Sequence, residues 1–273
     1  MVFISLHLQS NAKVVVEVLD AYEGRAIDAS AKFCREDVNP ATGPIFVCGA
    51  MPGDVLAIRI CAIHPAGIGY AGIGAGALSG RISERLIQQF EIGDAIHFSR
   101  GITLIPQPMI GVIGVAPCAG RLSTMDAGAH GGNMDCNLAR AGATVYLPVF
   151  VEGGLLAIGD VHALMGDGEV GGQGIEVTAE VELEIGIIKN WSLKRPMIET
   201  DDVWATVAAG DDFESAVWMA VHDMVDFLTS QLNITDGEAL LLISLTGDVR
   251  VCQIVTSTPT ARVEFPERLL SNG

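Results

Sequence analysis

The sequence predicts a β-rich body followed by a C-terminal part that contains both helices and strands. Three observations support this prediction: the chain combines 32 glycines with only 5% aromatic residues, its first two thirds alternate as strands do, and its clearest helical pattern comes late. Frequent glycines indicate many turns and close backbone approaches, which suit sheets better than a helical bundle. With 273 residues, of which 49% are hydrophobic, the chain can bury a large core in one large or two modest domains.

Strands are predicted where β-branched residues recur with period-two alternation. Residues 13–19 and 54–63 are two such runs, and Pro52 and Gly53 form a turn before the second. Residues 143–151 continue the pattern. In residues 174–188 the apolar side chains share one face, while a threonine and three glutamates share the other, which is typical of an antiparallel strand with one face in water.

The pattern changes near residue 190. Apolar side chains recur at three- and four-residue spacing through 211–232, which predicts a helix. A shorter helix is predicted over 239–245, and a strand over 249–255. We therefore divide the chain into a β-rich body that holds the candidate active-site loops, residues 1–190, and an α+β part, residues 191–273.

The chain is strongly acidic, with 16 basic against 33 acidic residues and a net charge of −17. A general nucleic-acid binder is excluded, because neutralising phosphates requires clusters of basic residues that the sequence lacks. Docking on anionic lipid is disfavoured for the same reason. Two uncharged stretches, 60–80 and 101–120, are long enough to raise the question of a membrane span, but their glycines and prolines indicate buried loops and short strands. We therefore expect neither a nucleic-acid nor a membrane partner.

Six cysteines are scattered along the chain without a repeated spacing, which predicts reduced and mostly buried thiols rather than a disulfide framework. The first residues lack the basic region and the cleavage site of a signal peptide. Both features favour a cytoplasmic location.

Acidic and imidazole side chains crowd into two glycine-rich segments, 130–135 and 159–169. These side chains are His130, Asp135, Asp160, His162, Asp167 and Glu169. In the first segment, the glycines permit a tight turn that can aim side chains and free backbone N–H groups at one point. In the second, Asp160 and His162 are two residues apart, so on an extended chain they project from the same face and suit joint coordination of one ion.

Such carboxylates need compensation if they are buried. Removing an unpaired carboxylate from water costs on the order of several kcal/mol, so a buried acid requires a cation, a protonated partner or water. A divalent metal with mixed histidine and aspartate ligands provides that compensation. The alternative is an exposed cluster of acidic loops, which is natural in so acidic a protein, and the residues alone leave the two interpretations open.

These segments, with several others in the same order, resemble the acetamidase/formamidase family. The matching stretches read NPATGPI at 39–45, GAMPGDVL at 49–56, GVIGVAP at 111–117, HGGNMD at 130–135 and GDVHALMGDGE at 159–169. The sequence departs from the family at Met165, where members often carry glutamine, and in a short N-terminus without the usual opening that contains His and Trp.

The resemblance implies a hydrolase that cleaves a small carboxamide, such as formamide or acetamide, to ammonia and a carboxylate. It also implies a mainly β fold with a jelly-roll-like sandwich or barrel body, a homodimer or larger homo-oligomer, and a bound divalent metal, Zn²⁺ or Ca²⁺. Two alternatives stay open: a hydrolase of another non-peptide C–N bond on the same scaffold, and a non-catalytic homologue that binds a small ligand.

We expect the site residues to divide into two roles. The expected metal ligands are His130, Asp135, Asp160, His162 and Asp20. The expected catalytic groups are Glu169 as the general base, Asp167, and the backbone N–H groups of Gly131 and Gly132 as an oxyanion hole. A metal at this place would polarise the amide carbonyl and lower the pKa of bound water towards about 7.

Overall fold

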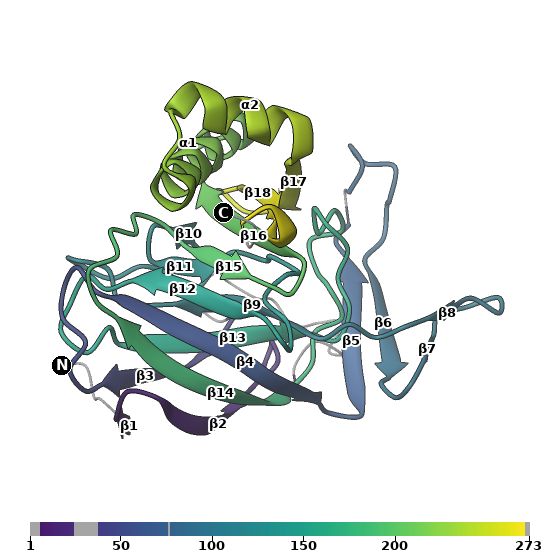
Figure 1. The fold of residues 1–273 in the computed structure, drawn as a ribbon. Coiled ribbons are helices and arrows are strands. Elements are labelled where there is room, and N and C mark those ends of the chain that lie inside the picture. The colour runs from purple at the N-terminus through teal and green to yellow at the C-terminus, as the bar shows by residue number, and fades with distance from the viewer. Residues whose placement is uncertain (1–5, 25–37, 76, 271–273) are drawn as a thin grey trace.

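The computed structural model of the protein describes residues 6–24, 38–75 and 77–270. Most of the regular structure in these ranges is strand, and the two α-helices found there lie near the C-terminus (Figure 1). The predicted mainly β fold with a C-terminal α+β part is therefore confirmed. The strands form two large sheets and two small pairs.

The first large sheet has six strands and the second has eight. In spatial order the first contains β1 (Leu6–Leu8), β3 (Ala41–Val47), β13 (Leu156–His162), β9 (Met109–Gly114), β11 (Gly131–Asn133) and β10 (Ala127–Gly128). The second contains β17 (Asp248–Gln253), β18 (Thr260–Pro266), β16 (Val203–Ala209), β15 (Met197–Glu199), β12 (Thr144–Pro148), β4 (Val55–Pro65), β14 (Ala179–Ile188) and β2 (Ala12–Val18). Apart from the parallel pair β1–β3, neighbouring strands run antiparallel.

The two sheets enclose the main hydrophobic core. Ile113 and Ile158 of the first sheet and Ile58 and Leu147 of the second are fully buried in one cluster. The two layers therefore pack face to face, as the strands of a sandwich do.

Strand β14 shows how the sequence produces this layering. Val181 and Leu183 are buried, whereas Glu182 between them is exposed. The strand lies between β2 and β4, which correspond to the strands predicted over 13–19 and 54–63. The alternation therefore predicted both the strand and its wet face.

The C-terminal helices cover one end of the second sheet. They are α1 (Phe213–Leu232) and α2 (Asp236–Thr246), and a short 3₁₀ helix, η2 (Glu267–Leu269), follows β18. Asp212 caps α1, because its carboxylate accepts a hydrogen bond of 2.7 Å from the backbone N–H of Ser215. Leu228 of α1 and Phe265 of β18 are fully buried in a second hydrophobic cluster. Both predicted helices are confirmed, and α2 begins three residues earlier than expected.

The expected division near residue 190 falls between β14 and β15. These strands belong to one eight-stranded sheet, so strands from both parts of the chain lie in the same layer. This continuity lets the C-terminal strands reach the loops of the body.

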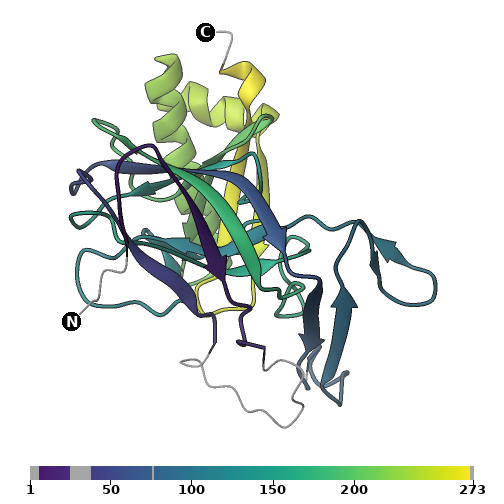
Figure 2. The same ribbon diagram turned by 90° about the horizontal axis from the view of Figure 1, so that it is seen from below.

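Two small strand pairs extend from the two-sheet body (Figure 2). They are β5 (Ile68–Ile73) with β6 (Leu86–Glu91), and β7 (Ile96–His97) with β8 (Thr103–Leu104). The uncharged stretches 60–80 and 101–120 contain short strands, as expected. The expected burial holds for β9, whereas most described residues of 60–80 are exposed or half-buried. Among the helices described, none has the length and apolar character needed to cross a bilayer.

Candidate functional site

Five buried acidic and imidazole side chains converge at one end of the first sheet. They are Asp135, Asp160, His162, Glu169 and Glu176. The ligand atoms of Asp135, His162 and Glu169 lie within 4.8 Å of one another, and so do those of Asp160, His162 and Glu176. His162 belongs to both sets, so it joins them into one cluster.

The sheet topology explains this convergence. Asp160 and His162 end β13, and Asp135 follows β11. Because β9 runs antiparallel between β11 and β13, the ends of those two strands meet at the same edge. Glu176 enters from the side, where its backbone exchanges hydrogen bonds of 2.7 and 2.9 Å with Tyr70 of β5. Segments far apart in the sequence therefore meet at one point.

His162 has the closest contacts in the cluster. Its Nε2 atom lies 3.2 Å from Oε2 of Glu176, 3.7 Å from Oδ1 of Asp160 and 3.9 Å from Oε1 of Glu169. Its side chain is fully buried. The structure thus places Asp160 and His162 side by side, as their two-residue spacing predicted.

Most polar atoms of the cluster have no hydrogen-bond partner within the described part of the chain. Both carboxylate oxygens of Asp135, Oδ1 of Asp160, Oε2 of Glu176 and both ring nitrogens of His162 are buried without one. Four carboxylates face one imidazole, so acceptor atoms and negative charge are in excess. A divalent cation that binds carboxylate oxygens and an imidazole nitrogen would satisfy these atoms, so the residues present fit a metal.

Crowding shifts the proton affinities of the cluster. Burial raises the pKa of Glu169 and that of Glu176 to about 7. Burial, with the neighbouring Glu169 and Asp160, also raises the pKa of Asp135 well above its ordinary value. Burial disfavours the charged form of His162, but the carboxylates of Glu176 and Asp160 raise its pKa well above the ordinary value. The cluster therefore holds protons near neutral pH unless a cation replaces them.

Three residues of the cluster have left-handed backbone conformations. The φ angle is 47° at Asp135, 56° at Asp160 and 47° at Glu169, a region that residues other than glycine rarely occupy. Such a conformation costs on the order of 1–3 kcal/mol and persists only where the surrounding structure enforces it. Strain of this kind gathers at functional sites, so it supports the assignment independently of the charges.

Two glycines leave room for these side chains. A Cβ atom on Gly111 of β9 would approach Oδ1 of Asp135 to 2.7 Å and Oδ2 of Asp160 to 2.8 Å. A Cβ atom on Gly174 would lie 2.7 Å from Cγ of His162. Glycine at these two positions therefore leaves space for the cluster that a larger side chain would occupy.

Asn39 orients one of the acids. Its Nδ2 atom donates a hydrogen bond of 2.9 Å to Oδ2 of Asp160, and Oδ1 of Asn133 lies 3.4 Å from the same nitrogen. The amide thus holds one oxygen of Asp160, and the other oxygen is left facing the cluster.

His130, an expected ligand, lies elsewhere. It precedes β11 whereas Asp135 follows it, so a strand of three residues separates them. The groups of described residues that could hold a metal do not include it. Its ring lies close to Gly128 and Gly132, in a mostly apolar pocket of about 290 Å³, and burial lowers its pKa.

Asp20 and Asp167 also have partners outside the cluster. The carboxylate of Asp20 accepts hydrogen bonds of 2.9 and 2.8 Å from the backbone N–H groups of Tyr22 and Gly24, so it stabilises a turn. Asp167 forms two hydrogen bonds with the guanidinium of Arg262, at 2.8 and 2.9 Å. The structure therefore gives both carboxylates structural partners.

Gly131 and Gly132 lie within β11, which pairs with β9 on one side and β10 on the other. Both have positive φ angles, 88° and 85°. A Cβ atom would come within 2.3 Å of the carbonyl oxygen of Ile113 at the first and 2.2 Å of that of Asp126 at the second. Glycine is required here by backbone conformation and close packing.

The sequence interpretation missed Glu176 and Asn39. Glu176 falls at the start of the alternating segment 174–188, on the face assigned to solvent, so its burial was not expected. Asn39 stands in the family-like stretch 39–45, which gave a resemblance but no role. The sequence offered one signal for Glu176: it is an acid that stands just before a strand and shortly after a glycine-rich acidic segment.

A pocket adjoins the cluster on the side of β5. It has a volume of about 310 Å³, and Tyr22, Gln173 and Arg85 line it together with several glycines. Nε2 of Gln173 donates a hydrogen bond to the hydroxyl of Tyr22. The backbone N–H of Gly172, which lines the pocket, donates a hydrogen bond of 2.7 Å to the carbonyl of Glu169, so the pocket and the cluster lie close together. Burial raises the pKa of Tyr22, and the charges of Glu176 and Asp160 raise it further.

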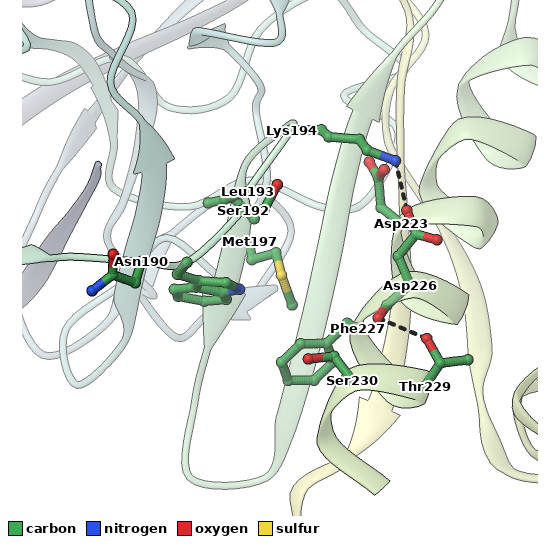
Figure 3. A pocket seen from close by; sticks show the side chains of 11 residues that line it. Asn190, Ser192, Leu193, Lys194, Met197, Asp223, Asp226, Phe227, Thr229 and Ser230 are labelled. Carbon is green, nitrogen blue, oxygen red and sulfur yellow. Dashed lines mark hydrogen bonds and ion pairs between the residues drawn. The ribbon is translucent and has the colours of Figure 1, made fainter. Parts of the chain in front are cut away.

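A larger pocket, of about 480 Å³, lies between α1 and the segment 190–197 (Figure 3). Its acids are already paired: Lys194 donates to Asp226 at 2.7 Å, and Arg195 donates to Asp223 at 2.7 Å. The polar groups that define its charge are thus satisfied within the protein, so we place the candidate site at the His162 cluster.

Comparison with known proteins identifies the family of the chain. The model of the acetamidase/formamidase family matches residues 115–266. The crystal structure of a predicted acetamidase/formamidase from Thermoanaerobacter tengcongensis is 40% identical, has a TM-score of 0.94, and aligns over 98% of this chain and 91% of that one. An acetamidase structure from Bacillus halodurans is 35% identical, with a TM-score of 0.94, over 98% of this chain and 93% of that one.

Curated relatives match over shorter stretches. A formamidase from Methylophilus methylotrophus is 35% identical over 82 residues, which are 28% of this chain and 20% of that protein. The match thus spans about a fifth of the length of that relative. The family match nevertheless covers more than half of the chain, and the structural matches cover nearly all of it. This chain belongs to the acetamidase/formamidase family.

Proposed function

We propose that the protein hydrolyses a small carboxamide, of the size of formamide or acetamide, to ammonia and a carboxylate. The supporting observation is the buried cluster around His162, most of whose polar atoms have no hydrogen-bond partner among the described residues. It occurs in a chain whose relatives are named formamidase and acetamidase.

A divalent metal would be held by Asp135, Asp160, His162 and Glu176. When bound, such an ion polarises a carbonyl oxygen and activates water at neutral pH. The imidazole nitrogen favours Zn²⁺ over Ca²⁺, because Ca²⁺ prefers oxygen ligands alone. The chain itself contributes by fixing the four side chains in a nearly dry position, since each is almost fully buried.

Glu169 serves as the general base in this proposal. Burial raises its pKa to about 7 in the metal-free protein, and a cation beside it would lower that value, so that the carboxylate is deprotonated and able to take a proton. The carboxylate takes a proton from water and delivers it to the leaving amine, which departs as ammonia. This scheme assigns no chemical step to His130, Asp20, Asp167, Gly131 or Gly132.

The pocket beside Tyr22 and Gln173 provides a place for the substrate. A carboxamide offers one carbonyl acceptor and one NH₂ donor, and the side-chain amide of Gln173 has the complementary pair. The pocket itself is lined by the cation Arg85 and by neutral residues, and the carboxylates of the cluster beyond it disfavour an anionic ligand at the reacting position.

The decisive experiment measures ammonia released from formamide, acetamide, propionamide and benzamide. The enzyme is assayed after metal depletion and after reloading with Zn²⁺ or Ca²⁺. We expect turnover of the small linear amides by the reloaded enzyme. If no amide releases ammonia, the proposal fails, and release only from cyclic amides or other C–N compounds favours the alternative hydrolase. Full activity without metal would remove the metal from the scheme.

Two further expectations from the resemblance stay predictions. A homodimer or larger homo-oligomer would be detected by size-exclusion chromatography with light scattering. A cytoplasmic location would be detected by fractionation of the cells that produce the protein.

A further inference from the structure

Arg262 of β18 is a buried arginine that reaches from the C-terminal sheet to the turn before Glu169. Its side chain is 3% exposed. Nη1 and Nη2 donate to the two oxygens of Asp167 at 2.8 and 2.9 Å, and Nε donates to Glu264 at 2.7 Å. The planar guanidinium therefore binds Asp167 in the bidentate geometry that fixes orientation as well as distance.

The backbone beside Asp167 is attached to the same sheet. The N–H of Gly168 donates to the carbonyl of Cys252 at 2.9 Å, and the N–H of Ile254 donates to the carbonyl of Gly168 at 3.2 Å. Gly168 thus pairs with β17 as a short parallel bridge. Side-chain and backbone contacts together fasten two consecutive residues of the turn to the C-terminal strands.

Glu169 follows directly in the chain. Its left-handed backbone conformation requires an external constraint, because an unconstrained turn would relax it. Its carboxylate must also stay near His162, at 3.9 Å, within a cluster that tolerates little displacement. The neighbouring attachment to β17 and β18 supplies such a constraint.

We propose that Arg262 is a positioning residue for the cluster: through Asp167 it anchors the turn and so sets the place of Glu169. The part of the inference that concerns turnover rests on the proposed function. The opposing interpretation is that Arg262 only compensates buried charge and stabilises the sheet, without any effect on Glu169.

The chain offers variants that separate these interpretations. Asp167→Asn keeps the shape but weakens the ionic bond, and Arg262→Lys keeps the charge but loses the bidentate fork. Arg250→Gln is the matched control, because Arg250 lies opposite Arg262 in the β17–β18 pair and is 3.4 Å from Glu264. Asp167→Asn leaves the test valid if Arg262→Lys fails to fold.

Three measurements are compared between the variants and the wild type. Hydrogen exchange reports the protection of the turn amides at 168–172. Calorimetric titration of Zn²⁺ into metal-depleted protein reports the metal affinity. Ammonia release reports kcat and KM separately. Thermal unfolding identifies variants that have merely lost global stability.

We expect Asp167→Asn and Arg262→Lys to exchange faster at the turn, to bind Zn²⁺ about tenfold more weakly, and to lose about tenfold in kcat at unchanged KM. Arg250→Gln should match the wild type in all three. Unchanged exchange and unchanged Zn²⁺ affinity in both test variants would overturn the inference. The inference would also fail if Arg262→Lys lowered the melting temperature and changed nothing else.

The exchange measurement separates this inference from the proposed function. A wild type without amidase activity whose turn loosens in both variants contradicts the proposed function but supports the anchoring role. An active wild type whose turn is unaffected by either variant contradicts the anchoring role and leaves the proposed function intact.

Discussion

His162 and Glu176 lie 3.2 Å apart, from Nε2 to Oε2, yet neither buried atom forms a well-aligned hydrogen bond with any described residue. Proximity without bonding geometry is unusual for a buried acid and imidazole, which normally form a well-aligned hydrogen bond. Two ligands that point at one cation have this relation, because each directs a lone pair to the ion rather than to the other.

Replacing His162 should therefore remove metal binding. His162→Gln takes away the only residue shared by both sets of candidate ligands, so we expect a loss of Zn²⁺ affinity of more than about 100-fold, beyond the usual effect of an outer residue. His130→Gln is the control, since His130 lies apart from the cluster, and its affinity should equal that of the wild type. Calorimetric titration of metal-depleted protein measures both. A large loss in His130→Gln would instead restore the ligand role that the sequence suggested.

Glu169→Gln should nearly abolish turnover while the protein stays folded. The amide has about the same size as the carboxylate but cannot take a proton from water, so we expect kcat to fall by about 10²–10⁴. Glu180→Gln, at an exposed position of β14, controls for the loss of one negative charge. Steady-state ammonia release and circular dichroism provide the measurements. A Glu169→Gln variant with normal kcat would exclude the base role.

The pH dependence of stability should change when metal binds. Without metal, Glu169 and Glu176 have a pKa of about 7 in the folded protein, compared with about 4.3 for an unfolded glutamate. Between these values the folded state binds more protons than the unfolded state. The free energy of unfolding therefore falls as the pH rises from about 4.5 to about 7. At higher pH, the stabilisation that comes from these bound protons is absent.

A divalent cation replaces those protons, so its stabilising effect should grow over the same range. Thermal unfolding of metal-depleted and Zn²⁺-loaded protein at about pH 5.5 and about pH 8 measures the effect. We expect the larger gain in melting temperature at the higher pH. An equal gain at both values would show that the cation does not compete with protons at these carboxylates.

The features that were predicted from sequence depend on local periodicity. The two-residue spacing predicted that Asp160 and His162 lie side by side, and the alternation of β14 predicted one buried face, so both were accessible without knowledge of the fold. The left-handed backbone of Asp160 was not. Glu176 was missed because its burial arises from pairing with Tyr70 and His162. Tyr70 is far from Glu176 in the sequence, and His162 belongs to another strand, β13. No local pattern encodes that contact.

The same reasoning explains Asp167 and His130. Asp167 lies two residues before Glu169, which suggested a catalytic role for it. The structure shows it bound to Arg262, which is 95 residues away in the sequence. His130 and Asp135 share one motif, but the short strand between them carries their side chains to different places. Motif membership predicted the neighbourhood of the site, whereas the roles of individual residues depended on tertiary contacts.

Gly111→Ala tests whether the geometry of the acids matters as such. The added Cβ atom would lie 2.7 Å from Oδ1 of Asp135 and 2.8 Å from both the carbonyl oxygen and Oδ2 of Asp160, so Asp135 or Asp160 must move. We expect a loss of stability of about 1–3 kcal/mol from overpacking, together with weaker Zn²⁺ binding and lower kcat. Gly93→Ala is the control, because a Cβ atom there meets nothing within 4 Å.

Chemical denaturation and metal titration of the two glycine variants give the comparison. Gly111→Ala changes no charge and removes no ligand, so any loss of Zn²⁺ affinity must come from displaced acids rather than from a lost donor. If Gly111→Ala were destabilised but bound Zn²⁺ like the wild type, the carboxylates of Asp135 and Asp160 would not hold the ion. Weaker binding in Gly111→Ala, with normal binding in Gly93→Ala, would locate the ion between the two acids.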